Sequence, residues 1–194
     1  MTPSNSLRAT LRARRREIPR RVRTAAALQA ARHAARDLHL RRGLRVALYH
    51  SLAEELDTAP LIALCARRGC TLFFPRITDY RAARMRFFPA GLLSVNRYGI
   101  SEPHGAVASI ATRALDLVFL PVVGFDERGA RIGMGKGYYD RALAFRRMRS
   151  AWHRPRLIGV AFEIQRLPSI VMAPHDVPLD AILTERGYRS CSTG

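Results

Sequence analysis

Lysine is almost absent from this chain. Lys136 is the single lysine, although lysine and arginine together number 33 among the 194 residues. Because every other basic position carries arginine, position 136 is expected to need a compact, mobile ammonium that a planar guanidinium cannot replace. Acidic residues are also scarce, at 15, which leaves a net charge of +18. This imbalance makes a polyanion or a multiply charged anionic ligand the natural binding partner.

Cysteine is rare, and its spacing excludes two classes of small protein. Cys65, Cys70 and Cys191 are odd in number, show no CxxC spacing and have no nearby paired histidines. These features argue against a disulfide framework and against a zinc site. No stretch has the apolar length of a membrane span, and the arginine-rich N-terminus lacks the apolar core of a signal peptide. We therefore expect reduced thiols and a soluble, cytoplasmic protein without a membrane partner.

Linkers and repeats are lacking as well, so the chain is expected to fold as one domain. No long Pro/Gly/Ser segment divides it, and no internal repeat or low-complexity segment occurs. With 194 residues and 48% hydrophobic content, it can bury a substantial core. Residues 1–42 are expected to form basic N-terminal helices that pack on this core.

Apolar spacing and turn residues predict an alternation of helices and strands. Two basic helices are expected between Leu7 and about Leu40, separated by Pro19. Further helices are expected at 58–68 and 138–148, and buried strands at 44–49, 71–74, 115–120, 157–162 and 181–184. The first of these strands, the helix after it and the strand at 71–74, ended by Pro75, form a βαβ unit. The sequence therefore predicts an α/β fold with a parallel sheet and a basic helical extension.

A glycine cluster at 133–137, Gly-Met-Gly-Lys-Gly, surrounds the single lysine. Glycines let backbone N–H groups approach an anion closely, and a helix starting near Gly137 would direct its positive end to the same place. The cluster also lies beyond the carboxyl end of the strand at 115–120, where α/β sheets place their sites. These features favour a phosphate site, and an ordinary glycine-rich turn is the alternative.

Two familiar phosphate-binding templates do not fit this loop. Gly129 and Gly135 are one residue too far apart for a P-loop, and neither Ser nor Thr follows Lys136. Tyr138 stands where a dinucleotide-binding fingerprint has its last glycine.

The segment 117–143, LVFLPVVGFDERGARIGMGKGYYDRAL, closely resembles the signature of the 5-formyltetrahydrofolate cyclo-ligase family. Four further segments match in the same order: LRATLRARRREI at 7–18, LYHSLAEELDTAPLI at 48–62, RYGISEP at 97–103 and APHDVPLDAILTE at 173–185. Several spaced matches are more specific than one glycine motif, and they extend over nearly the whole chain.

This resemblance implies a single-domain, three-layer α/β/α sandwich with a mostly parallel sheet. It also implies an ATP- and Mg²⁺-dependent ligase that cyclises 5-formyltetrahydrofolate to 5,10-methenyltetrahydrofolate and releases ADP and phosphate. In the implied reaction the formyl oxygen takes the γ-phosphoryl group, and the folate N10 then attacks the formyl carbon. The expected partners are small molecules, a reduced folate and ATP, and we expect a monomer without a nucleic-acid partner.

The resemblance also assigns roles to individual residues. The implied catalytic residues are Lys136, Arg131 and Tyr138, with Lys136 on the γ-phosphate. The implied ATP contacts are Ser4, Arg8, Arg131, Gly133, Met134, Gly135, Lys136, Gly137, Tyr138 and Tyr139. The implied folate contacts are Leu52, Glu55, Asp57, Met134 and Tyr138, and the implied Mg²⁺ ligands are Asp140 and Asp180.

Each assignment has a plainer structural alternative. Asp140 could be an ordinary carboxylate in the first turn of a helix, and Asp180 a turn residue before a strand. Of Tyr138 and Tyr139, only one can face a given ligand, because adjacent residues on a helix point in different directions. The charged residues at 52–57 could simply belong to a solvated loop. Most of the other arginines of the N-terminal helix are expected on solvated faces, because Arg14, Arg15 and Arg16 cannot all point one way.

Three positions depart from the family pattern. Ser4 replaces a lysine that usually contacts the ATP phosphates, and Met134 replaces a usual arginine, histidine or other polar residue. Glu54 replaces a frequent glycine beside the folate segment. These departures bear on substrate affinity more than on reaction class.

Two other functions remain open on sequence alone. The net charge of +18 is compatible with a catalytically impaired relative that binds RNA or another polyanion, although no RRM, KH or helix-turn-helix signature is present. A nucleotide-binding relative that acts on another small carbonyl substrate is the third possibility, and the matches at 52–57 and 97–103 argue against it.

Overall fold

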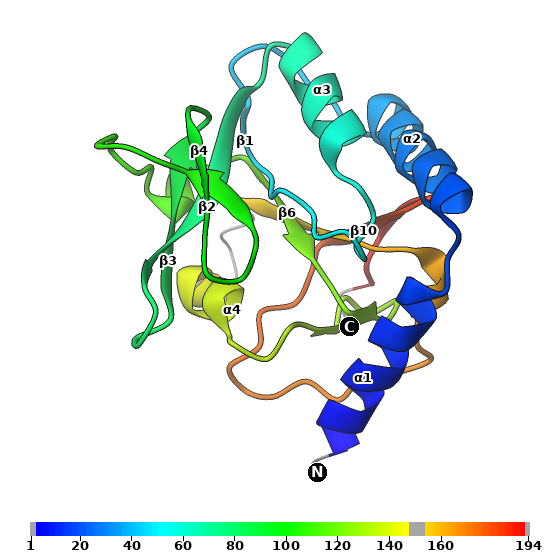
Figure 1. The fold of residues 1–194 in the computed structure, drawn as a ribbon. Coiled ribbons are helices and arrows are strands. Elements are labelled where there is room, and N and C mark those ends of the chain that lie inside the picture. The colour runs from blue at the N-terminus through cyan, green and yellow to red at the C-terminus, as the bar shows by residue number, and fades with distance from the viewer. Residues whose placement is uncertain (1–2, 148–153, 193–194) are drawn as a thin grey trace.

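The computed structural model describes residues 3–147 and 154–192 as a single-domain α/β fold built on a seven-stranded sheet (Figure 1). The strand order is β11-β10-β9-β6-β1-β2-β3. The five inner strands are mutually parallel, whereas the edge strands β3 and β11 run antiparallel to their neighbours. The predicted α/β class and mostly parallel sheet are therefore confirmed.

The sheet strands are β1 (Arg45–Ala47), β2 (Thr71–Asp79), β3 (Arg84–Pro89), β6 (Leu117–Pro121), β9 (Arg156–Val160), β10 (Ala181–Thr184) and β11 (Gly187–Ser190). Two small hairpins pair β4 (Leu93–Val95) with β5 (Ser101–Pro103) and β7 (Gly124–Phe125) with β8 (Arg131–Ile132). The α-helices are α1 (Pro3–Arg16), α2 (Arg20–Asp37), α3 (Ala59–Arg67) and α4 (Tyr138–Ala142), and the 3₁₀ helices are η1 (Thr112–Ala114), η2 (Ala144–Arg146) and η3 (Glu163–Gln165).

Both faces of the sheet are covered, which produces two separate cores. Alternate residues of a strand point to opposite faces, so Val46 enters one core and Ala47 the other. Helices α2 and α3 cover the first face, where the small side chains of Ala30 and Ala34 let α2 approach the strands closely. The short α4 and η2 cover the second face, which buries Leu143 completely. The chain thus forms three layers.

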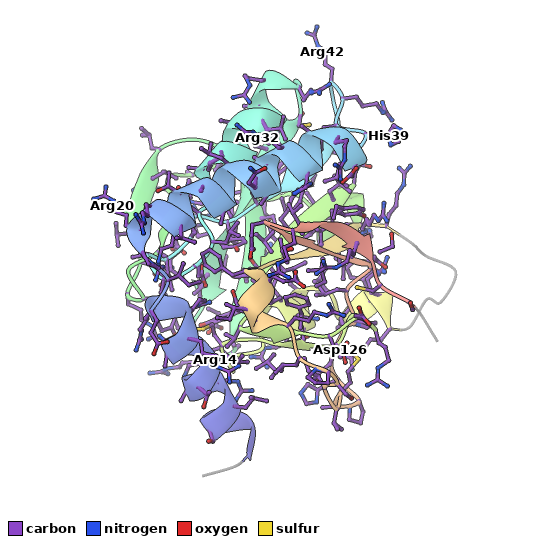
Figure 2. The ribbon with its side chains drawn as sticks, turned by 90° about the vertical axis from the view of Figure 1, so that its right-hand side faces the viewer. Arg14, Arg20, Arg32, His39, Arg42 and Asp126 are labelled. Carbon is purple, nitrogen blue, oxygen red and sulfur yellow. The ribbon has the colours of Figure 1, made fainter. Side chains whose placement is uncertain are left out.

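Helix α1 packs over loops, away from both faces of the sheet. Its Leu11 is buried against Val123 and Ile132, which belong to the segment that follows β6. Pro19 separates α1 from α2, as predicted, because proline is well tolerated at the start of a helix. In Figure 2, α1 and α2 carry the labelled side chains of Arg14, Arg20 and Arg32, all of which are exposed.

The prediction that the second strand ends at Pro75 is wrong. Strand β2 continues to Asp79 and pairs along its second half with β3. The pairing between β1 and β2 ends at Phe73. The missing N–H of Pro75 therefore removes no hydrogen bond between β2 and β1. The edge strands β3 and β11 and both small hairpins were missed, because short, partly exposed strands have a weak apolar signal.

The helix predicted at 138–148 is shorter than expected. Helix α4 ends at Ala142 and continues into the 3₁₀ helix η2, while Met148 lies outside the described residues. The predicted strand at 181–184 is confirmed residue for residue. In the described part of the chain, no helix is both long and apolar enough to cross a membrane.

Gly129 fixes the approach of the segment after β7 to the segment before β10. Its φ is +83°, and a Cβ atom there would lie 2.3 Å from the Leu179 carbonyl oxygen. Gly43 has a similar φ of +80°, but a Cβ atom there would have no heavy atom within 4 Å. Alanine at either position would pay the energetic cost of a left-handed backbone conformation, but only alanine at 129 would also clash with neighbouring atoms. Comparing the two substitutions therefore separates these two costs.

We predict that Gly43→Ala lowers the free energy of unfolding by about 1–2 kcal/mol, the cost of the left-handed conformation. Gly129→Ala should cost at least about 2 kcal/mol more, because backbone atoms must move. Urea denaturation of both variants measures the difference. Equal losses would show that Gly129 is not a packing constraint.

Candidate active site

The candidate site lies where the parallel strands end, as expected for an α/β sheet. The loop at 50–57 follows β1, and the glycine loop at 133–137 follows β8 in the segment after β6. Helix α1 contacts both loops, because Arg8 reaches the glycine loop and Arg12 reaches Glu54. Three segments far apart in sequence therefore meet here.

The glycine loop has a backbone that only glycine adopts easily. Gly135 and Gly137 have φ values of +88° and +66°, and α4 begins directly afterwards at Tyr138. Lys136 lies exposed between the two glycines. Within residues 3–147 and 154–192, its ammonium forms no ion pair. The single lysine is thus available to an anionic ligand.

Arg8 places a second cation at this loop. Its Nε donates a hydrogen bond to the Gly133 carbonyl oxygen at 2.9 Å. Its guanidinium carbon lies 3.7 Å from the position that a Cβ atom on Gly135 would take. Helix α1 therefore brings a positive charge to the loop that carries Lys136.

Arg131, a predicted phosphate contact, has partners inside the protein. Its two terminal nitrogens donate to the Val177 carbonyl oxygen and to Oδ1 of Asp140. The same Asp140 oxygen accepts a hydrogen bond from the Val177 N–H at 3.3 Å. This arrangement fixes the first turn of α4 against the segment before β10, and it occupies one of the two Asp140 oxygens.

The two tyrosines after the loop point in different directions. The Tyr138 hydroxyl lies 3.4 Å from the Tyr98 hydroxyl, and burial together with this contact raises the pKa of Tyr138 to about 12. Tyr139 faces the ring of Phe87 in the core, with 6.5 Å between ring centroids. Burial, assisted by the nearby Glu55 carboxylate, raises the pKa of Tyr139.

The loop at 50–57 contains one buried carboxylate and one helix-capping carboxylate. Glu55 is buried, and its Oε2 accepts a hydrogen bond from the Leu52 N–H at 3.0 Å. Burial outweighs this hydrogen bond and the nearby Arg15 and raises the pKa of Glu55. Asp57 instead accepts from the Ala59 N–H at 2.9 Å, at the start of α3.

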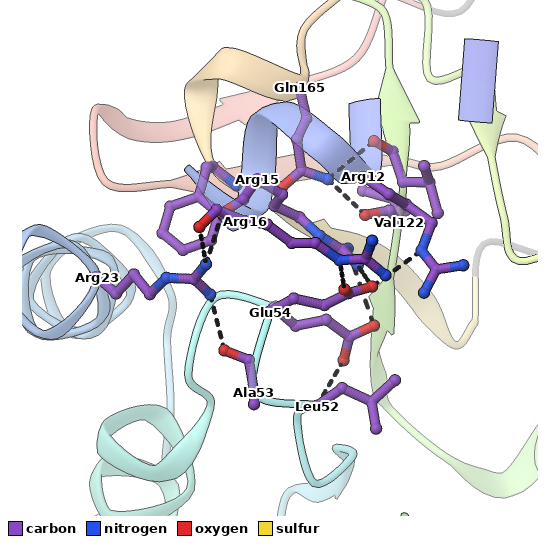
Figure 3. A network of polar contacts seen from close by, with 12 residues as sticks. Arg12, Arg15, Arg16, Arg23, Leu52, Ala53, Glu54, Val122 and Gln165 are labelled. Atoms are coloured by element: carbon purple, nitrogen blue, oxygen red, sulfur yellow. Dashed lines mark hydrogen bonds and ion pairs between the residues drawn. The ribbon is translucent and has the colours of Figure 1, made fainter. Parts of the chain in front are cut away.

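Glu54 receives three guanidinium groups from α1 (Figure 3). Its carboxylate oxygens lie 2.9 Å from Arg12 Nε, 2.6 Å from Arg15 Nη2 and 2.7 Å from Arg16 Nε. Arg15 is only 1% exposed, an exception to the solvated faces expected for most arginines of this helix. A guanidinium can be buried there because Glu54 neutralises it.

Two electrostatic effects oppose each other at Glu54. Burial raises the pKa of the carboxyl group, but hydrogen bonds from Arg16, Arg12 and Arg15 outweigh it and lower the pKa to about 2. Arg23 of α2 reinforces the contact, since its terminal nitrogens donate to the Ala53 and Arg15 carbonyl oxygens at 2.7 and 2.6 Å. Helix α1 is therefore attached to the loop at 50–57 by charge, and to Val123 and Ile132 by packing.

Asp180, the second predicted Mg²⁺ ligand, lies away from the glycine loop. Its Oδ1 accepts from Arg146 Nη2 at 2.7 Å, and its Oδ2 accepts from the Leu157 N–H at 2.7 Å. Leu157 is near the amino end of β9, whereas the glycine loop follows the carboxyl ends of the strands. Both oxygens of Asp180 therefore already have hydrogen-bond donors at the opposite end of the sheet.

The structure gives different amounts of information on the remaining predicted contact residues. Met134 is 44% exposed beside Lys136, and Leu52 is half-buried in its loop. Ser4 lies within α1, and its side chain is outside the described residues. The sequence did not predict that Glu54 pairs with the arginines of α1 or that Tyr98 contacts Tyr138. The available signals were the excess of arginine in α1 for Glu54 and the RYGISEP segment for Tyr98.

Comparison with known proteins agrees with this arrangement of motifs. Residues 1–185 match the 5-formyltetrahydrofolate cyclo-ligase family. The chain belongs to this family of ligases. It is 34% identical to the 5-formyltetrahydrofolate cyclo-ligase of Escherichia coli strain K12 over 145 residues, which are 72% of this chain and 76% of the relative. The Mus musculus cyclo-ligase is 32% identical over 150 residues, covering 73% of each chain.

Solved structures support the fold independently. The 5,10-methenyltetrahydrofolate synthetase of Aquifex aeolicus superimposes with a TM-score of 0.81 at 24% identity, covering 98% of this chain and 94% of that one. The synthetase of Mycoplasma pneumoniae gives a TM-score of 0.74 at 20% identity, covering 95% and 99%. The three-layer arrangement expected from the sequence is thus found in both.

We predict that Glu54→Gln lowers the free energy of unfolding at neutral pH by about 1–2 kcal/mol, discounted for partial solvent screening. The folded pKa is lower than the unfolded value of 4.5, so the carboxylate stabilises the protein above that pH. This contribution is lost as the pH falls from 4.5 towards 2. Urea denaturation at stepwise lower pH should therefore show the difference between wild type and variant shrinking.

The matched control is Asp37→Asn, which also removes a carboxylate that pairs with an arginine, Arg36. That pair lies on the exposed surface of α2, and its removal should leave stability unchanged within error. A pH-independent deficit in Glu54→Gln would contradict the electrostatic account of the α1 contact.

Proposed function

We propose that the chain catalyses the ATP- and Mg²⁺-dependent cyclisation of 5-formyltetrahydrofolate to 5,10-methenyltetrahydrofolate. The observation that supports this most is the single lysine, which has no ion-pair partner among the described residues and lies in a glycine loop contacted by Arg8. Family membership supplies the reaction class, and this loop supplies the chemistry that such a reaction needs. A monomeric state and a cytoplasmic location stay predictions.

The reaction needs a place where the triphosphate is held and its charge is balanced. In the proposed reaction the formyl oxygen attacks the γ-phosphorus, and the bond to the bridging oxygen breaks to release ADP. The folate N10 then attacks the formyl carbon, loses its proton, and inorganic phosphate leaves with the former formyl oxygen. No enzyme nucleophile is needed, so the protein contributes mainly alignment and charge stabilisation.

Lys136 and Arg8 are the cations that fit the triphosphate. A mobile ammonium can follow the γ-phosphoryl group as it moves, and the N–H groups of the glycine loop can approach the same oxygens. Arg131 fits a positioning role, because its guanidinium already holds Asp140 and the Val177 carbonyl. It would keep the start of α4 in place beneath the loop.

The loop at 50–57 fits the reduced folate. Glu55 is a buried carboxyl group with a raised pKa, beside the half-buried Leu52. Such a group can form a charge-assisted hydrogen bond with pterin N–H groups when a ligand displaces water. Tyr138, at the start of α4, offers an aromatic surface to a ring system. Asp57 fits helix capping better than substrate binding.

The chemistry of the side chains allows one Mg²⁺ ligand at the loop. Mg²⁺ commonly binds one or two carboxylates together with phosphate oxygens and water. Asp140 fits this requirement, since Arg131 and Val177 occupy only its Oδ1. Asp180 fits less well, because both of its oxygens accept hydrogen bonds at the amino end of β9. When bound, Mg²⁺ would neutralise phosphate charge, and Asp140 would hold it.

We predict that Lys136→Ala lowers kcat by about a hundredfold or more, because a cation aligned with developing charge is lost. Lys136→Arg should restore only part of the rate, since a rigid guanidinium cannot replace the ammonium. Near-ultraviolet absorbance of the methenyl product measures turnover. Full activity in Lys136→Ala would remove Lys136 from the mechanism.

The single lysine also permits a direct binding test. Reductive methylation with isotope-labelled formaldehyde would mark only Lys136 and the N-terminal amine, so NMR would give one resolved lysine signal. Adding Mg-ATP should shift that signal, whereas adenosine alone should not. This readout is independent of turnover.

We predict different effects for the two candidate Mg²⁺ ligands. Asp140→Asn should raise the Mg²⁺ concentration needed for half-maximal activity, by about tenfold for loss of one charged ligand. Asp180→Asn should leave this concentration unchanged and instead lower stability, because Arg146 loses its charged partner. Mg²⁺ titrations and urea denaturation of both variants test the assignment. A Mg²⁺ effect confined to Asp180→Asn would reverse it.

A further inference from the structure

Four unpaired arginines meet at the amino end of the sheet, away from the candidate active site. Arg41 and Arg42 lie shortly before β1, and Arg67 and Arg68 lie at the end of α3, shortly before β2. All four are exposed, and within the described part of the chain none of their guanidinium groups forms an ion pair or a hydrogen bond. We call these four residues the arginine patch.

Contacts between two turns bring the four residues together. The Gly43 N–H donates a hydrogen bond to the Gly69 carbonyl oxygen at 2.9 Å. A Cβ atom on Gly69 would lie 3.3 Å from the Cα, Cβ and Cγ atoms of Arg42. The Arg41 carbonyl oxygen accepts a weak hydrogen bond from the Cys70 thiol at 3.6 Å. The two arginine pairs therefore form one surface, because the turn before β1 packs directly on the turn after α3.

The acidic residues at this end of the sheet do not neutralise the arginine patch. Asp37, at the end of α2, pairs with Arg36 at 2.7 Å. Asp116, just before β6, accepts a hydrogen bond from the Arg45 N–H at 2.9 Å and lies 3.3 Å from Arg154 Nη1. Both carboxylates thus already face arginines outside the patch, which keeps the charge of its four guanidinium groups.

The arginine patch and the glycine loop lie at opposite ends of the sheet. Strands β1 and β2 are parallel and begin beside the patch, whereas the loop at 50–57 follows the carboxyl end of β1. Figure 2 shows Arg42 projecting from the molecule at the top of the view, while Arg14 of α1 lies in the lower part. A macromolecule bound at the patch would therefore leave the glycine loop open.

We propose that the arginine patch binds the phosphate backbone of a double-stranded nucleic acid without reading its sequence. A guanidinium group can pair with a phosphate through two parallel hydrogen bonds. The net charge of +18 adds a long-range attraction for such a polyanion. This inference goes beyond the proposed function and does not rest on it.

The surroundings of the patch favour a duplex backbone over other anionic surfaces. Segments 41–45 and 66–71 contain no aromatic residue, so they offer no platform on which unpaired bases could stack. Their only large aliphatic residue, Leu44, packs against the core and is not available to insert into a bilayer. The four guanidinium groups have no internal partner that fixes their positions, which suits a polymer with phosphates along its whole length better than a compact ligand.

This proposal differs from the expectation that no nucleic acid is bound. That expectation rested in part on the absence of RRM, KH and helix-turn-helix signatures. Contacts with phosphates position a protein on a nucleic acid but do not read its bases, so they need no such motif. The four arginines are visible in the sequence, but only the packing of the two turns places them on one surface.

Fluorescence anisotropy with short duplexes of RNA and of DNA tests the proposal. The wild type should bind the duplexes with an affinity that falls steeply as salt rises, because phosphate contacts release counterions. The variant Arg41→Ala/Arg42→Ala/Arg67→Ala/Arg68→Ala should bind at least about tenfold more weakly at low salt. Its slope of log K against log salt should be less negative by about three to four, since each phosphate contact contributes about 0.9. The duplex that binds more tightly identifies which nucleic acid is preferred.

The matched control is Arg14→Ala/Arg20→Ala/Arg21→Ala/Arg186→Ala, which removes the same charge from exposed positions outside the patch. None of these four arginines forms an ion pair within residues 3–147 and 154–192. Arg20 and Arg21 begin α2, about 25 Å along the helix from its other end near β1. The control should keep the wild-type slope. Equal weakening in both variants would overturn the proposal, because total charge alone would then explain binding.

Circular dichroism and urea denaturation show whether the variants fold. If the fourfold patch variant does not, Arg41→Ala/Arg42→Ala and Arg67→Ala/Arg68→Ala replace it, and each should change the slope by about half as much. An unchanged slope in both double variants would contradict the patch.

Competition with ATP separates the patch from the glycine loop. At constant ionic strength, saturating Mg-ATP should leave duplex binding unchanged, because ATP is proposed to bind at the opposite end of the sheet. Loss of duplex binding would place the nucleic acid at the glycine loop and overturn the proposal. Tighter binding of single strands or of phosphatidylserine vesicles through the same four arginines would do so as well.

The outcome for this inference is separate from the outcome for the proposed function. Turnover without duplex binding at low salt would refute the nucleic-acid surface alone. Duplex binding that depends on the patch, without turnover, would refute the cyclo-ligase reaction alone.

Discussion

The ion pairing between Glu54 and α1 is the interaction on which the arrangement of the site depends. A helix that packs over loops has little apolar surface to bury, and α1 places few large apolar residues, such as Leu11, against the protein. The three guanidinium groups at Glu54 compensate for this, because a buried charge is stable only when it is paired. The position of Arg8 over the glycine loop is a consequence of this attachment.

The same interaction changes how a departure from the family pattern is understood. On sequence alone, the glutamate that replaces a frequent glycine at position 54 is expected to bear on substrate affinity. In the structure the negative charge of Glu54 is neutralised by ion pairs with Arg12, Arg15 and Arg16. Glu55, the neighbouring residue, is buried, and its Oε1 lies 4.0 Å from Arg15 Nη1. The pKa values of the two adjacent carboxyl groups are therefore shifted in opposite directions, down for Glu54 and up for Glu55.

The single lysine has a special place among the 33 basic residues of the chain. Lys136 provides a mobile ammonium in the loop that is proposed to hold the transferred phosphoryl group. Arg76, Arg84 and Arg86 of the β2–β3 ribbon form a second positive region, apart from the glycine loop.

The sequence by itself determined the α/β class, the break at Pro19, the strand at 181–184 and the glycine loop around Lys136. These features depend on local signals, namely apolar runs, proline and glycine, whose effects act within a few residues. It did not determine the continuation of β2 through Pro75, the burial of Arg15, the internal partners of Arg131 or the separation of Asp180 from the loop. Each of these depends on which distant segment lies alongside, and only the packed chain brings a strand edge, a carboxylate or a carbonyl oxygen to that position.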